Sequence, residues 1–372
     1  MNKHLHIITH DIPWPADYGG VFDLFNKIKW LHKLNIKIHL HCFHKNRQPE
    51  PELNQYCEEV FYYPRKTGIK GYSFSLPYIV SSRKSELLKK RILANPYPVL
   101  MEGIHCSWLL NSGLLNGRKN IIRLHNVEHT YYDRLAANET NIFKRLYYFL
   151  ESILLKKYER KIAKKTLFVC VSKSDAEYYQ HTLGAATAFL PVFVPWEEIK
   201  ENSNRGCFCL YHGNLQINEN EKVADWLLNN VFGELDIPFV IAGKKPSLPL
   251  QCLAKSHPNT CITCSPGSKE MDDLISKAHV HVLPSFNQTG VKLKLLNALY
   301  NGRHCIVNKA GVSGSEVESL CHIAETADEF KAAIKAVYEM PFTAEDIAER
   351  KAILEKNYNN EKNARQLIAW LY

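Results

Sequence analysis

The sequence of 372 residues contains no run of about eighteen or more apolar residues, so no membrane-spanning helix is expected. Its start, MNKHLHIITH, leads directly into a predicted strand and lacks the long apolar region of a signal peptide. A serine nucleophile elbow and a Walker phosphate loop are also missing, which discounts two common kinds of catalytic site. These absences predict a cytoplasmic protein.

The spacing of cysteine and histidine in the sequence does not match that of known metal sites. Only one cysteine pair, Cys261 and Cys264, has the C-x-x-C spacing, whereas a four-ligand zinc site needs two such pairs. Cys207 and Cys261 fit buried strand positions instead. Histidines alternate in pairs on three predicted strands, without an accompanying carboxylate or cysteine pattern, so packing is the favoured interpretation. We expect no bound metal, no cofactor and reduced cysteines.

Positive charge is concentrated in one half of the chain. Up to Pro195 the sequence has 28 Lys and Arg against 16 Asp and Glu, a balance of +12, and the remainder carries −3. Such asymmetry indicates an anionic partner for the N-terminal half: membrane lipid, a lipid-linked pyrophosphate or nucleic acid. The segment Ile142–Lys165 combines aromatic with basic residues, which suits either an anionic membrane surface or an ordinary amphipathic helix with a solvated basic side.

Strand and helix patterns alternate along the first half, which predicts a parallel, doubly wound sheet. Predicted helices cover Val21–Leu34, Lys84–Ala94 and Ile142–Lys165. Strands are predicted at His4–Thr9, Ile36–Cys42, Glu59–Tyr63, Val99–Glu102, Asn120–Leu124 and Leu167–Val171.

The pattern restarts after a linker-like segment that contains Pro195 and ENSNRG. Further strands are predicted at Cys207–Tyr211, Phe239–Ala242, Cys261–Thr263, His279–Leu283 and Cys305–Val307. The predicted fold is therefore α/β, with two Rossmann-like doubly wound domains that face a cleft. The expected domains are residues 1–195 and 206–355, with a C-terminal helix over 356–372 able to pack back on the first domain.

The stretch from His281 to Gly314 is the most informative part of the sequence. It is predicted to form a strand, a polar loop, a helix that ends at Gly302, a strand and a glycine-rich turn. Lys292 and Lys294 fall in the first turn of that helix, where cations are unfavourable for the helix dipole. A bound phosphate would offset this unfavourable interaction by pairing with the two lysines, and a helix start that follows a loop is a common anion-binding site.

This stretch resembles the donor-binding segment of retaining GT-B glycosyltransferases, in the large family that includes sucrose synthase and bacterial mannosyltransferases. One branch carries G-x-K-x-K-x-x-E-A-x-x-x-G followed by an apolar strand and G-x-x-G. The matching residues here are Gly290, Lys292, Lys294, Asn297, Ala298, Gly302, Cys305–Val307, Gly311 and Gly314. The family usually has two glutamates eight residues apart, where this chain has Thr289 and Asn297. The resemblance implies that Thr289, Gly290, Lys292, Lys294 and Asn297 bind the sugar donor.

Two further motifs lie at predicted strand ends of the first half. Gly19 and Gly20 follow the first strand, and the resemblance puts such a pair beside the donor, although a tight turn is the simpler interpretation. The sequence HNVE presents His125 and Glu128 at another strand end. The family has a histidine next to the transferred sugar, which implies that His125 is catalytic and that Glu128 binds the acceptor or acts as a base. The alternative is that His125 and Asn126 only cap the next helix.

In the second half, Gly213 follows the first strand as the family's phosphate loop does, but Asn214 stands where many members have arginine. Lys244, at the next strand end, is then a candidate for binding the diphosphate. In the third motif of the first half, VSKSD, we expect Ser172 or Ser174 to be a helix N-cap without a catalytic role.

Together these features predict a metal-independent, retaining glycosyltransferase that moves a sugar from a nucleotide diphosphate sugar to a glycan or lipid-linked glycan. Surface polysaccharide synthesis, a peripheral position on the inner face of the membrane and no nucleic-acid partner are expected. Two alternatives stay open: an inactive glycan-binding or scaffold homologue, because of Thr289 and Asn297, and a sugar-nucleotide 2-epimerase, whose usual paired carboxylates are not evident.

Overall fold

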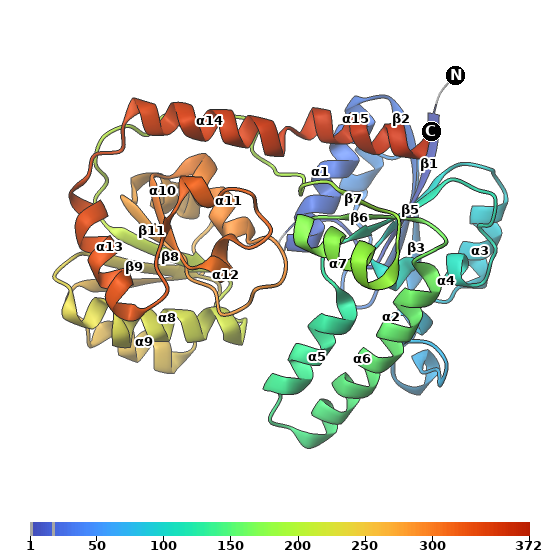
Figure 1. Cartoon of the computed structure of the whole chain (residues 1–372), viewed down its shortest axis with the longest axis horizontal. Helices are drawn as coiled ribbons and strands as arrows, with labels where there is room; N and C mark the ends of the chain where they lie inside the picture. The colour runs from blue at the N-terminus through green and yellow to red at the C-terminus, as the bar shows by residue number, and fades with distance from the viewer. Residues whose placement is uncertain (1–2, 17–18) are drawn as a thin grey trace. The chain divides into compact units, whose positions relative to one another are not determined.

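The computed structural model describes residues 3–16 and 19–372 and divides into two compact units (Figure 1). Unit 1 comprises the chain up to Pro195 together with Tyr358–Tyr372, and unit 2 comprises Trp196–Asn357. Each unit is built around a parallel sheet with helices on its faces, which confirms the two Rossmann-like folds predicted from the sequence. No helix in the described part of the chain is long and apolar enough to cross a membrane.

The sheet of unit 1 has seven parallel strands in the order β3-β2-β1-β4-β5-β6-β7. Their bounds are β1 Lys3–Thr9, β2 Ile36–His44, β3 Glu59–Pro64, β4 Val99–Glu102, β5 Asn120–Leu124, β6 Leu167–Cys170 and β7 Thr187–Phe189. Ile7 of β1 lies opposite Leu40 of β2 and Leu100 of β4, and all three are fully buried. The order of the strands reverses between β1 and β4, so a crevice is expected outside their carboxyl ends.

Helices cover both faces of this sheet because its strands are apolar on both sides. The helices are α1 Gly19–Lys33, α2 Tyr78–Ser81, α3 Glu86–Leu93, α4 Trp108–Asn111, α5 Glu128–Asn138, α6 Ile142–Ile162, α7 Lys173–Leu183 and α15 Asn360–Leu371. Leu24 of α1 and Leu367 of α15 belong to the core on one face. Leu155 of α6 belongs to the core on the other face. The Ser172 hydroxyl accepts a hydrogen bond from Asp175 N at 3.1 Å, which confirms the predicted N-cap of α7.

The sheet of unit 2 has six parallel strands in the order β10-β9-β8-β11-β12-β13. Their bounds are β8 Cys209–Gly213, β9 Phe239–Gly243, β10 Thr260–Cys264, β11 Val280–Val282, β12 His304–Val307 and β13 His322–Ile323. The helices are α8 Asn218–Asn230, α9 Leu248–Lys255, α10 Ser268–Lys277, α11 Leu293–Asn301, α12 Lys309–Val312, α13 Ala327–Glu339 and α14 Ala344–Tyr358. Here the strand order reverses between β8 and β11.

The predicted burial of Cys207 and Cys261 is wrong, since both are exposed. Strand β8 begins only at Cys209, so Cys207 precedes it, and Cys261 lies on β10, the strand at the edge of the sheet. The strands β7 and β13, of three and two residues, escaped prediction because such short segments show no periodicity.

Candidate active site

Polar side chains gather at the carboxyl edge of the sheet in unit 1, beside the β1/β4 switch point. His10 follows β1, Glu102 is the last residue of β4, and His125 follows β5. Glu128 begins α5, directly after that strand. Because parallel strands end on the same edge, residues far apart in the sequence meet there, as the HNVE motif predicted for His125 and Glu128.

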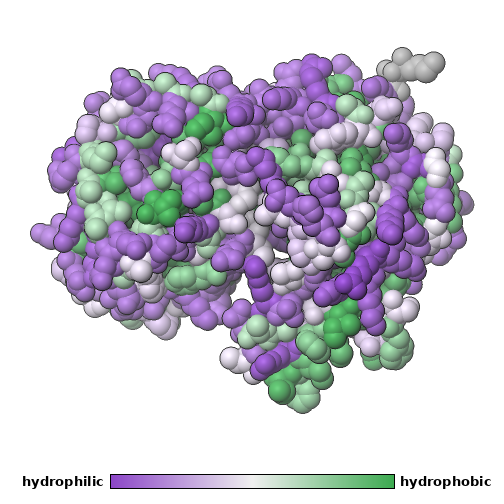
Figure 2. All heavy atoms as spheres, in the orientation of Figure 1, coloured by the Kyte–Doolittle hydropathy of each residue, from purple (hydrophilic) through white to green (hydrophobic). Residues whose placement is uncertain are grey.

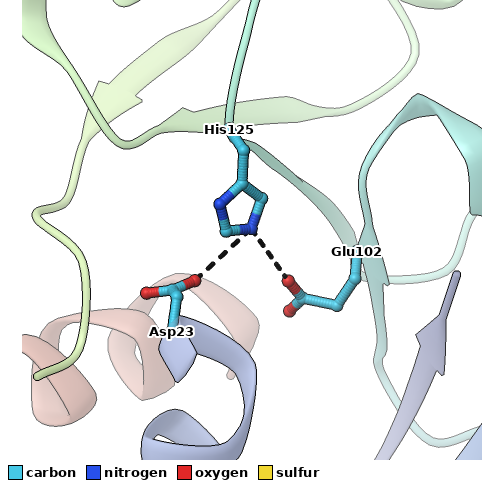
Figure 3. Close-up of side chains that lie close together, drawn as sticks. All are labelled: Asp23, Glu102 and His125. Carbon is cyan, nitrogen blue, oxygen red and sulfur yellow. Dashed lines mark ion pairs between the residues drawn. The ribbon is translucent and has the colours of Figure 1, made fainter. Parts of the chain in front are cut away.

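His125 points between two carboxylates that the sequence analysis did not single out (Figure 3). Its Nε2 atom lies 3.5 Å from Asp23 Oδ2 and 3.6 Å from Glu102 Oε2. Asp23 comes from α1 and is fully buried, as is Glu102, whereas the His125 side chain remains 20% exposed. The distances are longer than good hydrogen bonds, so the carboxylates act on His125 mainly through their charge.

Both carboxylates are held by cations. Lys27 Nζ lies 3.1 Å from Asp23 Oδ2 and 2.8 Å from Glu102 Oε1. Arg123 Nη2 lies 3.2 Å from Asp23 Oδ1. Burial by itself raises the pKa of Asp23, but Arg123 and Lys27 outweigh burial and hold that pKa well below its usual range. The pKa of Glu102 is lowered in the same way, chiefly by Lys27. Both groups therefore stay ionised beside Nε2 of His125, in a network whose two carboxylates are balanced by the two cations Lys27 and Arg123.

Asp23, Glu102 and His125 each offer one ligand atom, and these atoms lie within 4.8 Å of one another. That spacing alone would suit a metal ion. However, the ammonium group of Lys27 already bridges the two carboxylates, and Arg123 neutralises one of them further. The two carboxylates are thus already paired with cations of the chain itself. This favours a charge network that positions His125 over a metal site.

Glu128 is buried at the first position of α5. Burial, together with the nearby Glu159, raises its pKa to about 8. At neutral pH the carboxyl group is therefore mostly protonated and can donate a hydrogen bond, and a modest change of environment would make it a base. The N-cap of α5 is Val127, without a side-chain capping bond, so His125 and Asn126 are not the helix caps that the alternative interpretation proposed.

The glycine pair expected beside the donor opens helix α1, which begins at Gly19 and continues with Gly20. Asp17 and Tyr18, which belong to the same motif, lie outside the described residues. Asp23, one turn further along α1, is the residue that connects this helix to His125.

In unit 2, Lys294 lies against Tyr211 of β8, beside the β8/β11 switch point. Its Nζ donates to Tyr211 Oη and to Asn220 Oδ1, both at 3.3 Å, and lies 4.6 Å from the centre of the Tyr211 ring. Burial and the neighbouring Lys292 lower the pKa of Lys294 to about 8. A partly buried cation without a paired carboxylate among these contacts is suited to bind an anionic ligand.

The loop before α11 is organised by its own hydrogen bonds. Asn287 Oδ1 accepts from Thr289 N at 2.8 Å and from Thr289 Oγ1 at 2.7 Å. Lys292 is the N-cap of α11 and so precedes the first turn in which it was predicted to lie. Its Nζ donates to the carbonyls of Thr289 and Gly290 at 2.6 and 3.0 Å. Gly290 has φ +68°, a conformation that glycine adopts without strain. The loop therefore holds its shape before any ligand arrives.

The remaining donor candidates lie on neighbouring elements of unit 2. Gly213 ends β8, and the carbonyl of Asn214 accepts from Asn220 Nδ2 at 3.0 Å. Lys244 follows β9 and is exposed. On α11, Asn297 Oδ1 accepts from Asn301 Nδ2 at 2.8 Å, one turn along the helix. Asn220 thus connects Asn214 to Lys294, whereas Asn297 uses its acceptor within its own helix.

The sequence analysis missed four residues of unit 1, namely Asp23, Lys27, Glu102 and Arg123. One signal was present in the sequence. Asp23 and Lys27 are charged residues four apart in an otherwise apolar helix pattern, and Glu102 ends an apolar strand. Their meeting with His125 depends on the packing of α1 against the sheet, which the sequence pattern alone does not specify.

Comparison with known proteins agrees with this architecture. Residues 207–340 match the family described as glycosyl transferases group 1. An uncharacterized 44.6 kDa protein in cps region of Klebsiella pneumoniae is 27% identical over 330 residues, covering 83% of this chain and 84% of the relative.

Two solved structures share the fold. The first, described as trehalose-6-phosphate from E. coli bound with UDP-2-fluoro glucose, has a TM-score of 0.66 at 9% identity over 99% of each chain. The second, sucrose-phosphate synthase from Thermosynechococcus elongatus, has a TM-score of 0.62 at 12% identity, covering 98% of this chain and 94% of that one.

Proposed function

We propose a donor, an acceptor class and residue roles for this chain, which is a GT-B glycosyltransferase with a glycosyl transferases group 1 domain over residues 207–340. The donor is a nucleotide diphosphate sugar, and the acceptor is a glycan or lipid-linked glycan in surface polysaccharide synthesis. The relative in a cps region supports the polysaccharide context.

The observation that carries the donor assignment is the setting of Lys294. Its ammonium is partly buried against Tyr211 and Asn220, at the edge of the sheet where α/β folds bind ligands. A diphosphate would supply the negative charge that these contacts lack. Lys292, Lys244 and the backbone of Gly213 and Gly290 are the further donor-binding groups of the proposal.

His125 is assigned to the transferred sugar, with Asp23 and Glu102 as positioning residues. The two ionised carboxylates orient the imidazole. In a retaining transfer without a protein nucleophile, the departing diphosphate can accept the proton of the acceptor hydroxyl while Lys294 stabilises its developing charge. This scheme uses no metal, and Glu128 binds the acceptor by donating a hydrogen bond to it.

Turnover tests the proposal. Thermal-shift screening against UDP, GDP, ADP and CMP first identifies the nucleotide, since a ligand that binds the folded state raises its Tm. The corresponding nucleotide sugars are then incubated with lipid-linked and free glycan acceptors, and nucleoside diphosphate release is measured. We expect the parent protein to release nucleoside diphosphate only when an acceptor is present. The Lys294→Ala and His125→Ala variants should lose this release.

Other outcomes favour the alternatives. Conversion of the donor sugar without an acceptor would identify a sugar-nucleotide 2-epimerase. Glycan binding without turnover of any donor would identify an inactive binding or scaffold protein, for which Thr289 and Asn297 in place of glutamates are the motivating observation.

A further inference from the structure

We propose that unit 1 carries a surface that inserts into the interface of an anionic lipid bilayer. The surface has two parts: the first three turns of α6, residues 142–153, here named the hairpin tip, and residues 66–75 around the short helix η2 (Gly68–Gly71), here named the η2 loop. The inference goes beyond the transfer chemistry and requires none of the donor-site assignments.

The hairpin tip exposes apolar side chains that a soluble helix would normally bury. Phe143 is 80% exposed, and large apolar residues elsewhere on the chain are exposed mostly singly. The exposed apolar residues of the tip are Ile142, Phe143, Leu146, Tyr147, Phe149, Leu150 and Ile153. Figure 2 shows hydrophobic surface gathered at the end of the α5–α6 hairpin, among some hydrophilic residues.

The spacing of these residues places them on one side of α6. At 100° per residue they span roughly 160° of the helix circumference. The buried residues of α6, which include Leu155, Tyr158 and Ile162, lie on the opposite side and pack against unit 1. Helix α6 is therefore anchored by one face and presents an apolar stripe on the other.

The same outer face becomes basic beyond the tip. Lys156, Lys157, Arg160 and Lys161 continue it along the helix, and all four are exposed. No acidic side chain lies on this face of α6, all of whose residues the structure describes. These four basic residues are here named the basic collar. An apolar helix end followed by basic residues is typical of a helix that enters the headgroup region and contacts anionic lipid.

The η2 loop adds a second apolar element beside the first. Ile69 is 95% exposed and Phe74 is 89% exposed. The loop is fixed to α2 because Ser81 Oγ donates to the Gly71 carbonyl at 2.6 Å. Helix α2 is in turn fixed to α6, since Ile79 N donates to Glu151 Oε1 at 3.1 Å.

Charge decides which partner suits this surface. A second copy of the chain would bring its own basic collar against this one, whereas an anionic bilayer is complementary to it. A hollow of about 470 Å³ lies at the tip. Its lining is mostly apolar, with Ala136, Leu146 and Phe149 among it, and Asp133 and Arg145 add one charge of each sign, so it offers room for part of an acyl chain. We therefore assign the surface to anionic phospholipid.

Vesicle co-sedimentation of the full chain tests the assignment. Vesicles of phosphatidylcholine are compared with vesicles in which roughly one lipid in four is phosphatidylglycerol. Binding to the anionic vesicles that weakens with salt is expected. A Phe143→Ser/Phe149→Ser variant should bind at least about tenfold more weakly, because it removes exposed apolar contacts with lipid and not with the core. Leu248→Ser, at an exposed apolar position in unit 2, is the matched control and should bind as the parent does.

Two further variants separate the parts of the surface. Lys156→Glu/Lys157→Glu should remove the preference for anionic vesicles, and Phe143→Trp should show a blue-shifted emission when these vesicles are added. Absence of binding to anionic vesicles, or equal binding by the double serine variant, would overturn the proposal. Light scattering tests self-association. If the parent chain forms dimers and the serine substitutions dissociate them, the surface would be assigned to self-association instead. Nucleotide binding and donor turnover with a free glycan are independent of these results, so either proposal can fail alone.

Discussion

Lys294 is the residue on which donor binding most depends in the proposed mechanism. We predict that Lys294→Ala weakens binding of the correct nucleoside diphosphate by about tenfold to a hundredfold, since a charge-assisted contact is worth about 1.5–3 kcal/mol. Titration calorimetry measures this change. Lys269→Ala, at an exposed position on α10, is the control. Unchanged affinity in the Lys294→Ala variant would remove this residue from the donor site.

His125 is expected to act on the reacting sugar and not on the nucleotide. We predict that His125→Ala lowers kcat on the order of a hundredfold, with a much smaller change in nucleotide affinity. Steady-state kinetics and calorimetry measure the two quantities separately. Loss of nucleotide binding with normal turnover at saturation would show that the role assigned to His125 is wrong.

Asn297 replaces a glutamate of the resembled family. An amide can still hydrogen-bond a ribose diol, but without the charge assistance of a carboxylate. We predict that Asn297→Glu binds the donor equally well or tighter, by up to about fivefold. The new carboxylate can still accept from Asn301, as the Asn297 oxygen does at 2.8 Å. Weaker donor binding at unchanged Tm would place the ribose elsewhere.

At the scale of elements, the join between α11 and β12 depends on a glycine. A Cβ atom at Gly302 would lie 2.0 Å from His281 Nε2 and 2.9 Å from the Ala298 carbonyl, and His281 is fully buried. We predict that Gly302→Ala lowers the free energy of unfolding by about 1–3 kcal/mol, because a packed core accommodates added volume poorly. Urea denaturation measures the loss.

Gly267→Ala provides the matched control, since a Cβ there meets nothing within 4 Å and φ is −65°. That variant should lose less stability than Gly302→Ala. Gly267 is the N-cap of α10, where alanine is a poorer cap by roughly 1 kcal/mol or less, and the reduced conformational freedom of the unfolded chain offsets part of this loss. Equal stability of both alanine variants would mean that the buried His281 side chain can move away from Gly302 without cost, contrary to the packing described.

At the scale of the whole molecule, buried histidines in both units make the fold sensitive to acid. Burial lowers the pKa of His6, His10 and His212 to about 3, in His6 and His10 with help from nearby positive charges and in His212 from Lys294. Between pH 6.5 and 3 the unfolded chain binds protons at these positions and the folded chain does not. The free energy of unfolding therefore falls as pH falls through this window, by up to about 1.4 kcal/mol per pH unit for each histidine.

Urea midpoints at pH 7.5, 6 and 5 measure this dependence. His6→Gln should flatten it, whereas His181→Gln, at an exposed position, should leave it unchanged. A midpoint that does not move between pH 7.5 and 5 would contradict the prediction. The raised pKa of Glu128 acts with the opposite sign. The unfolded chain loses this proton above about pH 4.5 and the folded chain keeps it up to about pH 8, so this group lowers the free energy of unfolding as pH rises across that window.

Elements with strong periodicity were predictable from the sequence. The apolar runs of β1, β4 and β5 and the leucines of α11 indicate strand or helix by local spacing, and each is found within a residue or two of its predicted bounds. The polar residues that follow such strands were identifiable for the same reason. His125 could therefore be named from its place after a strand and Lys294 from its place at a helix start, in both cases together with the family resemblance.

The sequence by itself determined the two Rossmann-like folds and the loop–helix segment that leads into α11, because hydrophobic period and glycine placement are local properties of the chain. Only the tertiary structure decided that Asp23 and Glu102, 79 residues apart in the sequence, meet at His125, and that Lys27 and Arg123 neutralise them. It also decided which face of α6 is buried. Burial and charge pairing depend on distances between elements, and these are set by packing that no local pattern encodes.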